Sequence, residues 1–322
     1  MRKAGCIVAV VLAVLAAIAL VFGATALGSA NIEEETPFIV PAGSSLGAVA
    51  QKLEDEGLIS SADGFLLRAK LFGSSDPIQA GEFALTPDMG QGDILTHFQS
   101  GDVIRRFITV PEGMPSVLVW EKLMAEELLT GKVDVPLEGS VLPDTYDYER
   151  GEDRAAVLDR MQTAMDRYLA QTWAKRGKDI AVDTMQEALT LASIVEKETG
   201  TPGERRRVAG LYSNRLKTGM RLQADPTIIY PITKGKPLGR RILRSEIAAV
   251  NGYNTYSMDG LPDGPITNPG RESIAAVLNP EAHDYLYMVA DGTGGHEFTS
   301  TLDEHNAAVA KWYRIRRERG EM

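Results

Sequence analysis

The stretch Leu189-Thr190-Leu191-Ala192-Ser193-Ile194-Val195-Glu196-Lys197-Glu198-Thr199 is an apolar run that ends in two carboxylates. Its apolar character predicts a helix, which we place over residues 184–199. Glu198 follows Leu191, Ile194 and Val195 at helical spacing, so it shares their face, whereas Glu196 lies on the flank. The apolar arc is wide, so this spacing only favours Glu198.

A carboxyl group in such a setting suits the cleavage of a glycosidic bond. That reaction needs an acid still protonated near neutral pH, and burial against apolar neighbours raises the pKa of a glutamate. On spacing alone, the alternative is a solvated residue at the helix end, or one paired with an arginine.

The N-terminus predicts a membrane anchor. Arg2 and Lys3 precede an apolar run over residues 4–27, long enough to cross a hydrocarbon core of roughly 30 Å. The basic residues predict that the N-terminus stays in the cytoplasm and that the chain from about Asn31 faces outward. A cleaved signal peptide is the alternative, since small residues occupy 24–26 and 28–30. Both interpretations predict export.

Composition excludes several classes of function. The net charge of −10 and the isoelectric point near 5.1 argue against a nucleic-acid binder, which would need a basic stripe. The single cysteine, Cys6, cannot form an internal disulfide, and no Cys/His spacing typical of zinc occurs. The sequence therefore predicts neither nucleic acid, metal nor cofactor as a partner.

The 322 residues exceed the usual size of one domain, so several are expected. After the anchor, a strand over 38–40 ends in a Pro/Gly turn. Ser44 or Ser45 can cap the helix that follows, a second helix is expected over 62–72, and a strand follows near 82–85. This order predicts a small α+β module.

A sequence echo marks the start of a second unit. Val40-Pro41-x-Gly43 recurs as Val110-Pro111-x-Gly113, which predicts a new strand–turn–helix beginning near Arg106. This echo is either a true duplication or the same local solution reached twice. Further along, the pattern predicts a strand at 285–289 and helices over 116–129, 155–175, 184–199, 204–216 and 302–317.

Two motifs resemble other enzyme sites. Gly43-Ser44-Ser45-Leu46-Gly47 matches the nucleophile elbow of serine hydrolases, but the surrounding module is too small and a helix cap explains it better. His296-Glu297 opens like a zinc-protease motif, yet position 300 is Ser, not His. Asp291 to Gly295 lacks a phosphate-binding lysine and is better interpreted as a hairpin turn.

Residues 192–199 read Ala-Ser-Ile-Val-Glu-Lys-Glu-Thr, which resembles the helix motif of the MltG (YceG-like) endolytic murein transglycosylases. The resemblance covers essentially the whole exported chain. The other matching segments are Glu138–Tyr146, Glu204-Arg205, Val208-Ala209, Asn214–Leu216, Gly219–Tyr230, Tyr253–Tyr256, Gly260–Pro262, Asn268–Gly270, Tyr285–Tyr287, Gly294–Phe298 and His305-Asn306.

The resemblance implies that Glu198 is catalytic in an endolytic lytic transglycosylase of peptidoglycan. Glu198 would protonate the oxygen between N-acetylmuramic acid and N-acetylglucosamine, leaving a 1,6-anhydro end and terminating strand elongation. Our candidates for the sugar-facing groove are Gln223, Asp225, Asn254 and Tyr256, with Tyr146 and His296 weaker. Each could instead be structural, and Asp225 could cap a helix before Pro226.

The resemblance also implies the domain organisation. Residues 1–30 would form the cytoplasmic N-terminus and transmembrane anchor, 31–105 a LysM-like glycan-binding module, and 106–322 a mixed α+β YceG-like catalytic domain. The alternative for the module is a spacer that sets distance from the membrane. The expected location is the inner membrane, single-pass, with the catalytic domain in the periplasm. The expected partners are peptidoglycan strands, the inner membrane and peptidoglycan synthases.

Two departures and two rival functions remain. Asn251-Gly252 and Asp263 replace residues common in the family, and both positions lie in turns, where we expect altered loop stiffness. One rival is a hydrolase (muramidase) using water with Glu198 and Asp225. The other is a scaffold that binds glycan without cleaving it.

Overall fold

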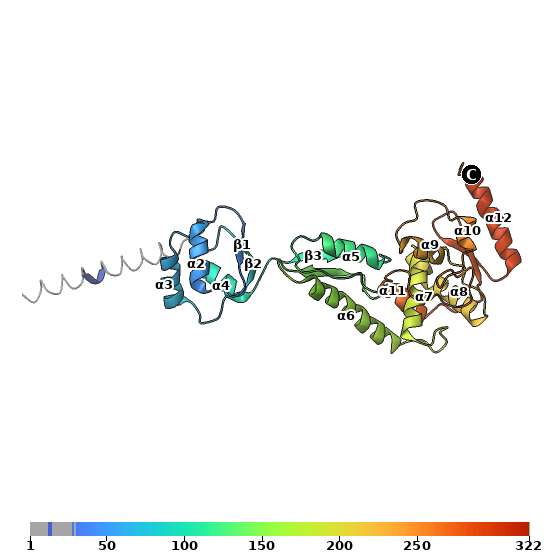
Figure 1. Cartoon of the computed structure of the whole chain (residues 1–322), viewed down its shortest axis with the longest axis horizontal. Coiled ribbons are helices and arrows are strands. Elements are labelled where there is room, and N and C mark those ends of the chain that lie inside the picture. The colour runs from blue at the N-terminus through green and yellow to red at the C-terminus, as the bar shows by residue number, and fades with distance from the viewer. Residues whose placement is uncertain (1–11, 15–27, 29, 322) are drawn as a thin grey trace, which may run out of the picture. The chain divides into compact units, whose positions relative to one another are not determined.

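The computed structural model describes residues 12–14, 28 and 30–321. The expected anchor at 1–30 lies almost entirely outside these residues. Among the helices that the structure does describe, none is both long and apolar enough to cross a membrane. The chain divides into two compact units, Met1–Arg106 and Phe107–Met322 (Figure 1). The first unit has one hydrophobic core and the second has two. The division falls beside the boundary expected from the sequence.

The first unit is a small α+β module. Strands β1 (Thr36–Val40) and β2 (Gly81–Leu85) pair antiparallel, with Phe38 opposite Phe83. Both rings pack against Phe98, at centroid distances of 5.5 and 5.0 Å. Helices α2 (Leu46–Asp55) and α3 (Ala62–Phe72) complete the expected order. Ser45 caps α2 by accepting a hydrogen bond from the Ala48 amide, as one of the two expected caps.

A third helix of this unit was not expected from the sequence. Helix α4 (Gln91–Ser100) begins after Gly90, whose amide donates to the Asp93 carboxylate, and ends at Gly101 in the left-handed conformation. Gly and Asp at its start look like a turn in the sequence. Burial of Ile94, Leu95 and Phe98 in the core stabilises the helix over a turn.

The second unit begins with a layer built on a two-stranded sheet. It contains β3 (Arg106–Thr109), α5 (Ser116–Ala125), β4 (Thr145–Tyr148) and α6 (Arg154–Trp173). Helix α5 ends four residues before the predicted end. Gly113 has φ of +71°, as Gly43 has +76° at the matching turn of the first unit, so both copies of the Val-Pro-x-Gly echo need glycine in the same backbone conformation.

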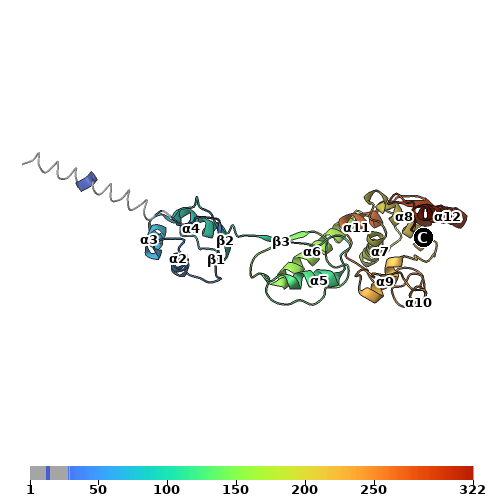
Figure 2. The ribbon, with the colours of Figure 1, turned by 90° about the horizontal axis from the view of Figure 1, so that it is seen from above.

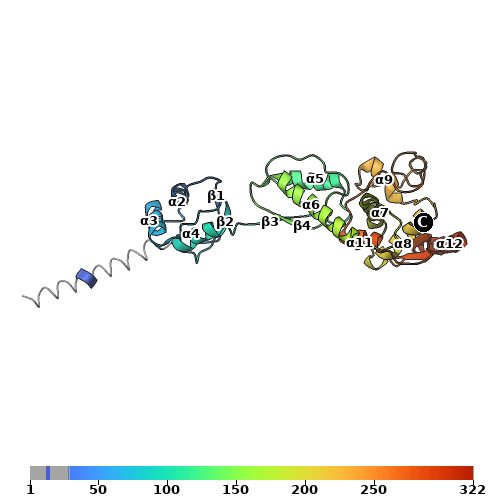
Figure 3. The same ribbon diagram turned by 90° about the horizontal axis from the view of Figure 1, so that it is seen from below.

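The rest of the second unit surrounds one buried helix. Helix α7 (Met185–Glu198) packs against α8 (Arg205–Lys217) and α11 (Arg271–Leu278), and it also contacts α6 and α9 (Asp225–Thr233). Figures 2 and 3 show α8 and α9 on opposite sides of α7. The remaining elements are the short 3-10 helix Pro202–Glu204, α10 (Arg244–Ile247), β5 (Tyr287–Ala290), β6 (His296–Thr299) and α12 (Leu302–Glu318).

The expected mixed α+β fold is therefore confirmed. Strands β5 and β6 form an antiparallel hairpin, so Asp291 to Gly295 is the turn that the sequence indicated. The helices expected over 155–175, 184–199, 204–216 and 302–317 are all present, with ends shifted by one or two residues.

Candidate functional site

Helix α7 carries the candidate acid at its last position. The helix starts with a capping box, in which Thr184 and Glu187 exchange hydrogen bonds through side chain and backbone. In its middle, the buried Ser193 hydroxyl accepts a hydrogen bond from the Ile266 amide. Eight consecutive residues of this helix are buried. The end of the helix is thereby held in place, and Glu198 with it.

Glu198 has the environment of an acid catalyst. Its side chain is partly buried, and the oxygen Oε1 is shielded from solvent without a hydrogen-bond partner. Burial, together with the charge of Asp225, raises the pKa of Glu198 to about 7, although Tyr212 and Arg215 act in the opposite direction. A carboxyl group with this pKa is substantially protonated near neutral pH, and no hydrogen bond to Oε1 has to break before a proton moves at that oxygen.

Helix α8 supplies the other face of the site. Arg215 donates to the carbonyl oxygens of Leu222 and Leu286, so its position is fixed by the backbone. Tyr212 is fully buried, and burial with the neighbouring Glu198 charge raises its pKa well above 10. Its phenol therefore stays protonated as Glu198 titrates. Tyr212 has no local signal in the sequence, and Arg215 lies within the matching segment Asn214–Leu216.

Glu196 has a different environment from Glu198. Its Oε2 accepts hydrogen bonds from the Gly270 amide at 2.9 Å and from the Ser273 hydroxyl at 2.7 Å. Its Oε1 lies 3.9 Å from the Arg205 guanidinium. These contacts tie α7 to α8 and α11. Glu196 therefore has a structural role, and Glu198 is the member of the pair with an oxygen to spare.

Asp225 and Tyr256 lie together beside Glu198. The Tyr256 hydroxyl donates to Asp225 Oδ1 at 2.7 Å. Asp225 is the first residue of α9 and is exposed, and its charge is one of the causes of the raised Glu198 pKa. Two of the four predicted groove residues are thus brought to the candidate acid.

Gln223 stands just before Asp225 in an unusual backbone conformation. Its φ is +50°, in the left-handed region that non-glycine residues rarely adopt. The Gln223 amide donates to the Thr255 carbonyl at 3.2 Å, which holds the strained turn, and the side chain is exposed. Surrounding contacts have to maintain a strained backbone conformation of this kind, and such conformations are found most often at functional sites.

Asn254 is a correction to the predicted groove. Its side chain is 0% exposed, and its amide donates to the carbonyl oxygens of Glu246, Ile247 and Ala249. Its Oδ1 accepts from the Tyr256 amide. No polar atom of this side chain is left for a sugar, so Asn254 organises the loop that presents Tyr256.

The two weaker candidates also serve the fold. The Tyr146 hydroxyl donates to the Leu142 carbonyl at 2.6 Å, and burial raises the pKa of Tyr146 to about 12. His296 Nδ1 lies 2.8 Å from Glu204 Oε2, and the His296 amide donates to the same carboxylate. This pair joins β6 to the 3-10 helix before α8.

The second unit contains a hollow. It measures about 470 Å³ and is lined by Lys197 and Pro226, the chain neighbours of Glu198 and Asp225, and by apolar residues of α5 and α9. Within the described ranges, no group of acidic, histidine or cysteine side chains could hold a metal ion.

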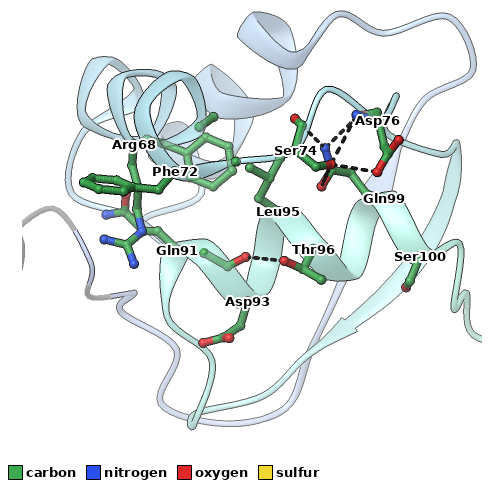
Figure 4. Close-up of a pocket in the computed structure, with 14 residues that line it drawn as sticks. Arg68, Phe72, Ser74, Asp76, Gln91, Asp93, Leu95, Thr96, Gln99 and Ser100 are labelled. Atoms are coloured by element: carbon green, nitrogen blue, oxygen red, sulfur yellow. Dashed lines mark hydrogen bonds between the residues drawn. The ribbon is translucent and has the colours of Figure 1, made fainter.

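The first unit has a hollow of its own. It measures about 600 Å³ and lies between α3 and α4 (Figure 4). The Gln99 amide donates to the carbonyl oxygens of Ser74 and Asp76, so these polar groups brace its wall. Arg68 lies beside the Phe72 ring at its other end. Both aromatic and polar groups are available there for a ligand.

Comparison with known proteins places these features in a family. The family model described as the YceG-like family matches residues 38–311. The endolytic murein transglycosylase of Bacillus subtilis is 30% identical over 312 residues, which cover 87% of this chain and 85% of that protein. That of Streptococcus pneumoniae is 28% identical, and the match covers 88% of this chain but 59% of the longer relative.

A solved structure agrees with the sequence comparisons. The crystal structure of a yceG-like protein from Listeria monocytogenes matches with a TM-score of 0.52 and 28% identity, covering 85% of this chain and 99% of that one. The resemblance drawn from the motif at 192–199 is confirmed. With its buried helix α7 ending at Glu198, the chain belongs to the YceG-like family.

Proposed function

We propose that this protein is a peptidoglycan lytic transglycosylase in which Glu198 is the acid and base. The observation that carries the proposal is the Glu198 carboxyl group, with a pKa raised to about 7 and one unpartnered oxygen. The names of the relatives from Bacillus subtilis and Streptococcus pneumoniae, both endolytic murein transglycosylases, support the same reaction class.

In the proposed reaction, the Glu198 proton passes to the oxygen that links N-acetylmuramic acid to the next N-acetylglucosamine. The bond from that oxygen to muramic C1 breaks, and positive charge develops at C1. The C6 hydroxyl of the same sugar attacks C1 and gives its proton to the Glu198 carboxylate, which closes a 1,6-anhydro ring. Because the nucleophile belongs to the substrate, one carboxyl group serves both steps, and the attack has the advantage of an intramolecular reaction.

The neighbours of Glu198 have separate parts in this scheme. The Asp225 carboxylate favours the protonated acid and stabilises positive charge at C1. Tyr256 holds Asp225 in place through its hydroxyl. Gln223 contributes an exposed amide to the sugar-facing groove.

Three finer parts of the proposal rest on the sequence. The apolar segment at 4–27 anchors the protein in the inner membrane, with the chain from about Asn31 onward on the periplasmic side. The first unit is a LysM-like module that holds glycan. Cleavage of nascent strands ends their elongation, which brings the protein into contact with peptidoglycan synthases.

The test is product analysis on purified glycan strands. Wild-type protein should release ends lighter by one water than hydrolysis products. Glu198→Gln should keep the fold and lose cleavage by about 10³-fold or more, since a positioned acid-base group contributes on the order of 10²–10⁴. Glu196→Gln is the matched control, because its amide oxygen can still accept from Gly270 and Ser273, and it should keep cleavage.

Other outcomes would reject the proposal. Reducing ends instead of anhydro ends would favour the muramidase, with Asp225 as second acid. Full activity of Glu198→Gln would remove Glu198 from the chemistry. Wall defects that are rescued equally well by wild type and Glu198→Gln would favour the glycan-binding scaffold.

A further inference from the structure

The hollow that Lys197 and Pro226 help to line has mainly apolar walls. Its walls include Met114, Pro115, Leu118, Ile229 and Ile266. No aromatic, amide or hydroxyl side chain lines this hollow. A sugar ring carries hydroxyl groups on most of its carbons, and each would lose its hydrogen bonds to water without gaining a partner here. The lining therefore suits aliphatic groups better than a pyranose.

The charged side chains at the rim of the hollow differ in whether they already form an ion pair within the protein. Lys236 pairs with Glu121 at 2.5 Å, and Glu112 pairs with Arg205 at 3.1 Å. Lys197 is exposed, and no ion pair joins it to another described residue. Its side chain runs past Gly113, at 3.8 Å from the position of an added Cβ. The rim thus offers an ammonium group for a negatively charged ligand.

The walls are fixed before any ligand arrives. Gly235 has φ of +83°, and a Cβ at this position would lie 2.7 Å from Pro115. Glycine therefore allows the backbone after α9 to approach the start of α5 closely. The Ser116 amide donates to the Glu138 carboxylate at 2.8 Å, which holds the start of α5. A preformed hollow loses little entropy on binding.

The location of the hollow relates it to the reaction. Lys197 and Pro226 directly adjoin Glu198 and Asp225 in the chain. If muramic C1 reacts at Glu198, as in the proposed function on which this inference rests, the substituents of that muramic ring extend from a point one residue along α7 from Lys197. The bulkiest is the short peptide on its lactyl group, which combines alanine methyls, an aliphatic diamino acid and free carboxylates.

We propose that this hollow is a subsite for the peptide stem of the muramic residue, with Lys197 pairing with a stem carboxylate. The protein carries a net charge of −10, and peptidoglycan is itself anionic, so attraction has to come from a local cation. Such a subsite makes strands that still carry their peptides the preferred substrate.

The experiment compares two substrates: glycan strands with intact peptides and the same strands after enzymatic removal of the peptides. Both are cleaved by full-length wild type and variants, and the quantity measured is the ratio of kcat/KM for the two strands. Wild type should prefer the peptide-bearing strands, and the preference should shrink with added salt, since exposed charges are screened.

Two variants test the charge and the wall independently. Lys197→Glu should lower the ratio by about fivefold, the scale of losing one exposed ion pair and adding a repulsion. Leu118→Asp changes a half-buried wall residue and should lower the ratio in the same direction. The matched control is Lys132→Glu, the same charge change at an exposed lysine outside the hollow, and it should keep the wild-type ratio.

The outcomes are distinguishable. Equal cleavage of both strands by wild type, or an unaltered ratio in both variants, would overturn the subsite. An equal loss on both strands would mean that the hollow contacts the sugar backbone instead, which also overturns it. Failure of wild type to produce anhydro ends from either strand would reject the proposed function itself.

Discussion

Two carboxylates two residues apart on one helix have been given opposite roles by their surroundings. Glu196 accepts two hydrogen bonds and lies near an arginine, so its charge is stabilised. Glu198 faces burial and a second negative charge, so its protonated form is favoured. The contacts of the two side chains thus assign them different tasks: Glu196 joins helices, and Glu198 is placed to exchange a proton.

The first prediction concerns the pH profile of cleavage. Because Glu198 has to be protonated to act as acid and its pKa is about 7, kcat/KM should fall as the pH rises above about 7. Asp225→Asn removes a charge that raises this pKa, so the fall should begin at a lower pH. Rate measurements across the pH range on soluble strands test this. An unmoved profile in Asp225→Asn would separate Asp225 from Glu198.

The second prediction concerns stability. Between the ordinary value of 4.5 and about 7, the folded protein binds more protons at Glu198 than the unfolded chain does, so the free energy of unfolding falls as the pH rises. At about 1.36 kcal/mol per pKa unit, this fall in the free energy of unfolding amounts to up to about 3 kcal/mol. Glu198→Gln removes it, because glutamine does not titrate. The variant should be more stable than wild type in alkaline solution and similar to it in acid.

Urea unfolding at several pH values measures this difference. Glu138, whose pKa is also raised to about 7 by burial, contributes to the same pH range. The slope should therefore become shallower in Glu198→Gln without disappearing. Identical slopes in wild type and variant would contradict the buried environment assigned to Glu198.

At the scale of elements, the sugar-facing groove is formed partly by loops, and helices α7 and α9 alone do not set the positions of these loops. Asn254 ties the loop after α10 to the end of that helix through the carbonyl oxygens of Glu246, Ile247 and Ala249. That loop carries Tyr256, which bonds to the first residue of α9. One buried amide therefore connects a loop, a helix start and the neighbourhood of the acid.

The third prediction follows from this link. Asn254→Ala removes the side-chain donor of the Ile247 carbonyl, whereas the Glu246 and Ala249 carbonyls keep the Ala249 amide and the Ser257 hydroxyl, so the cost is about 1–3 kcal/mol in total. The variant should unfold at lower denaturant concentration, whereas Gln223→Ala, at an exposed position, should weaken glycan binding with little change in stability. Weaker glycan binding by Asn254→Ala at full stability would return Asn254 to the groove.

At the scale of the whole molecule, the two compact units have separate cores. That of the first unit is centred on Phe38, Phe83 and Phe98. The second unit has one core around α7 and another between β3, β4, α5 and α6. Units with independent cores can unfold in separate transitions.

The fourth prediction uses this separation. Phe83 is fully buried, so Phe83→Ala should destabilise the first unit by about 3–5 kcal/mol. Calorimetry should show one transition moved to lower temperature and the other retained. Cleavage of short soluble strands should persist, because the candidate acid belongs to the second unit. A single shifted transition would show that the units unfold together.

The sequence by itself determined the elements with strong periodic signals and the motif that marks the family. The run 189–199 is apolar throughout, so it predicted both a buried helix and the acid at its end. Ser45 and Gly113 could be placed because caps and left-handed turns depend on local backbone chemistry. Helix α4 was not predicted because Gly90 and Gly92 obscure its start, and burial of its apolar face in the module core is a tertiary effect.

Tertiary structure alone decided which polar residues face the site. Asn254 and Tyr256 lie two residues apart in one motif. The Asn254 side chain is buried and donates to backbone carbonyl oxygens, whereas the Tyr256 hydroxyl donates to Asp225. Neither the proximity of Tyr212 to Glu198 nor the hollow beside Lys197 has a local signal in the sequence. Both depend on how helices α5, α7, α8 and α9 pack. Burial and proximity are properties of packing between distant segments, and the pKa of Glu198 depends on both.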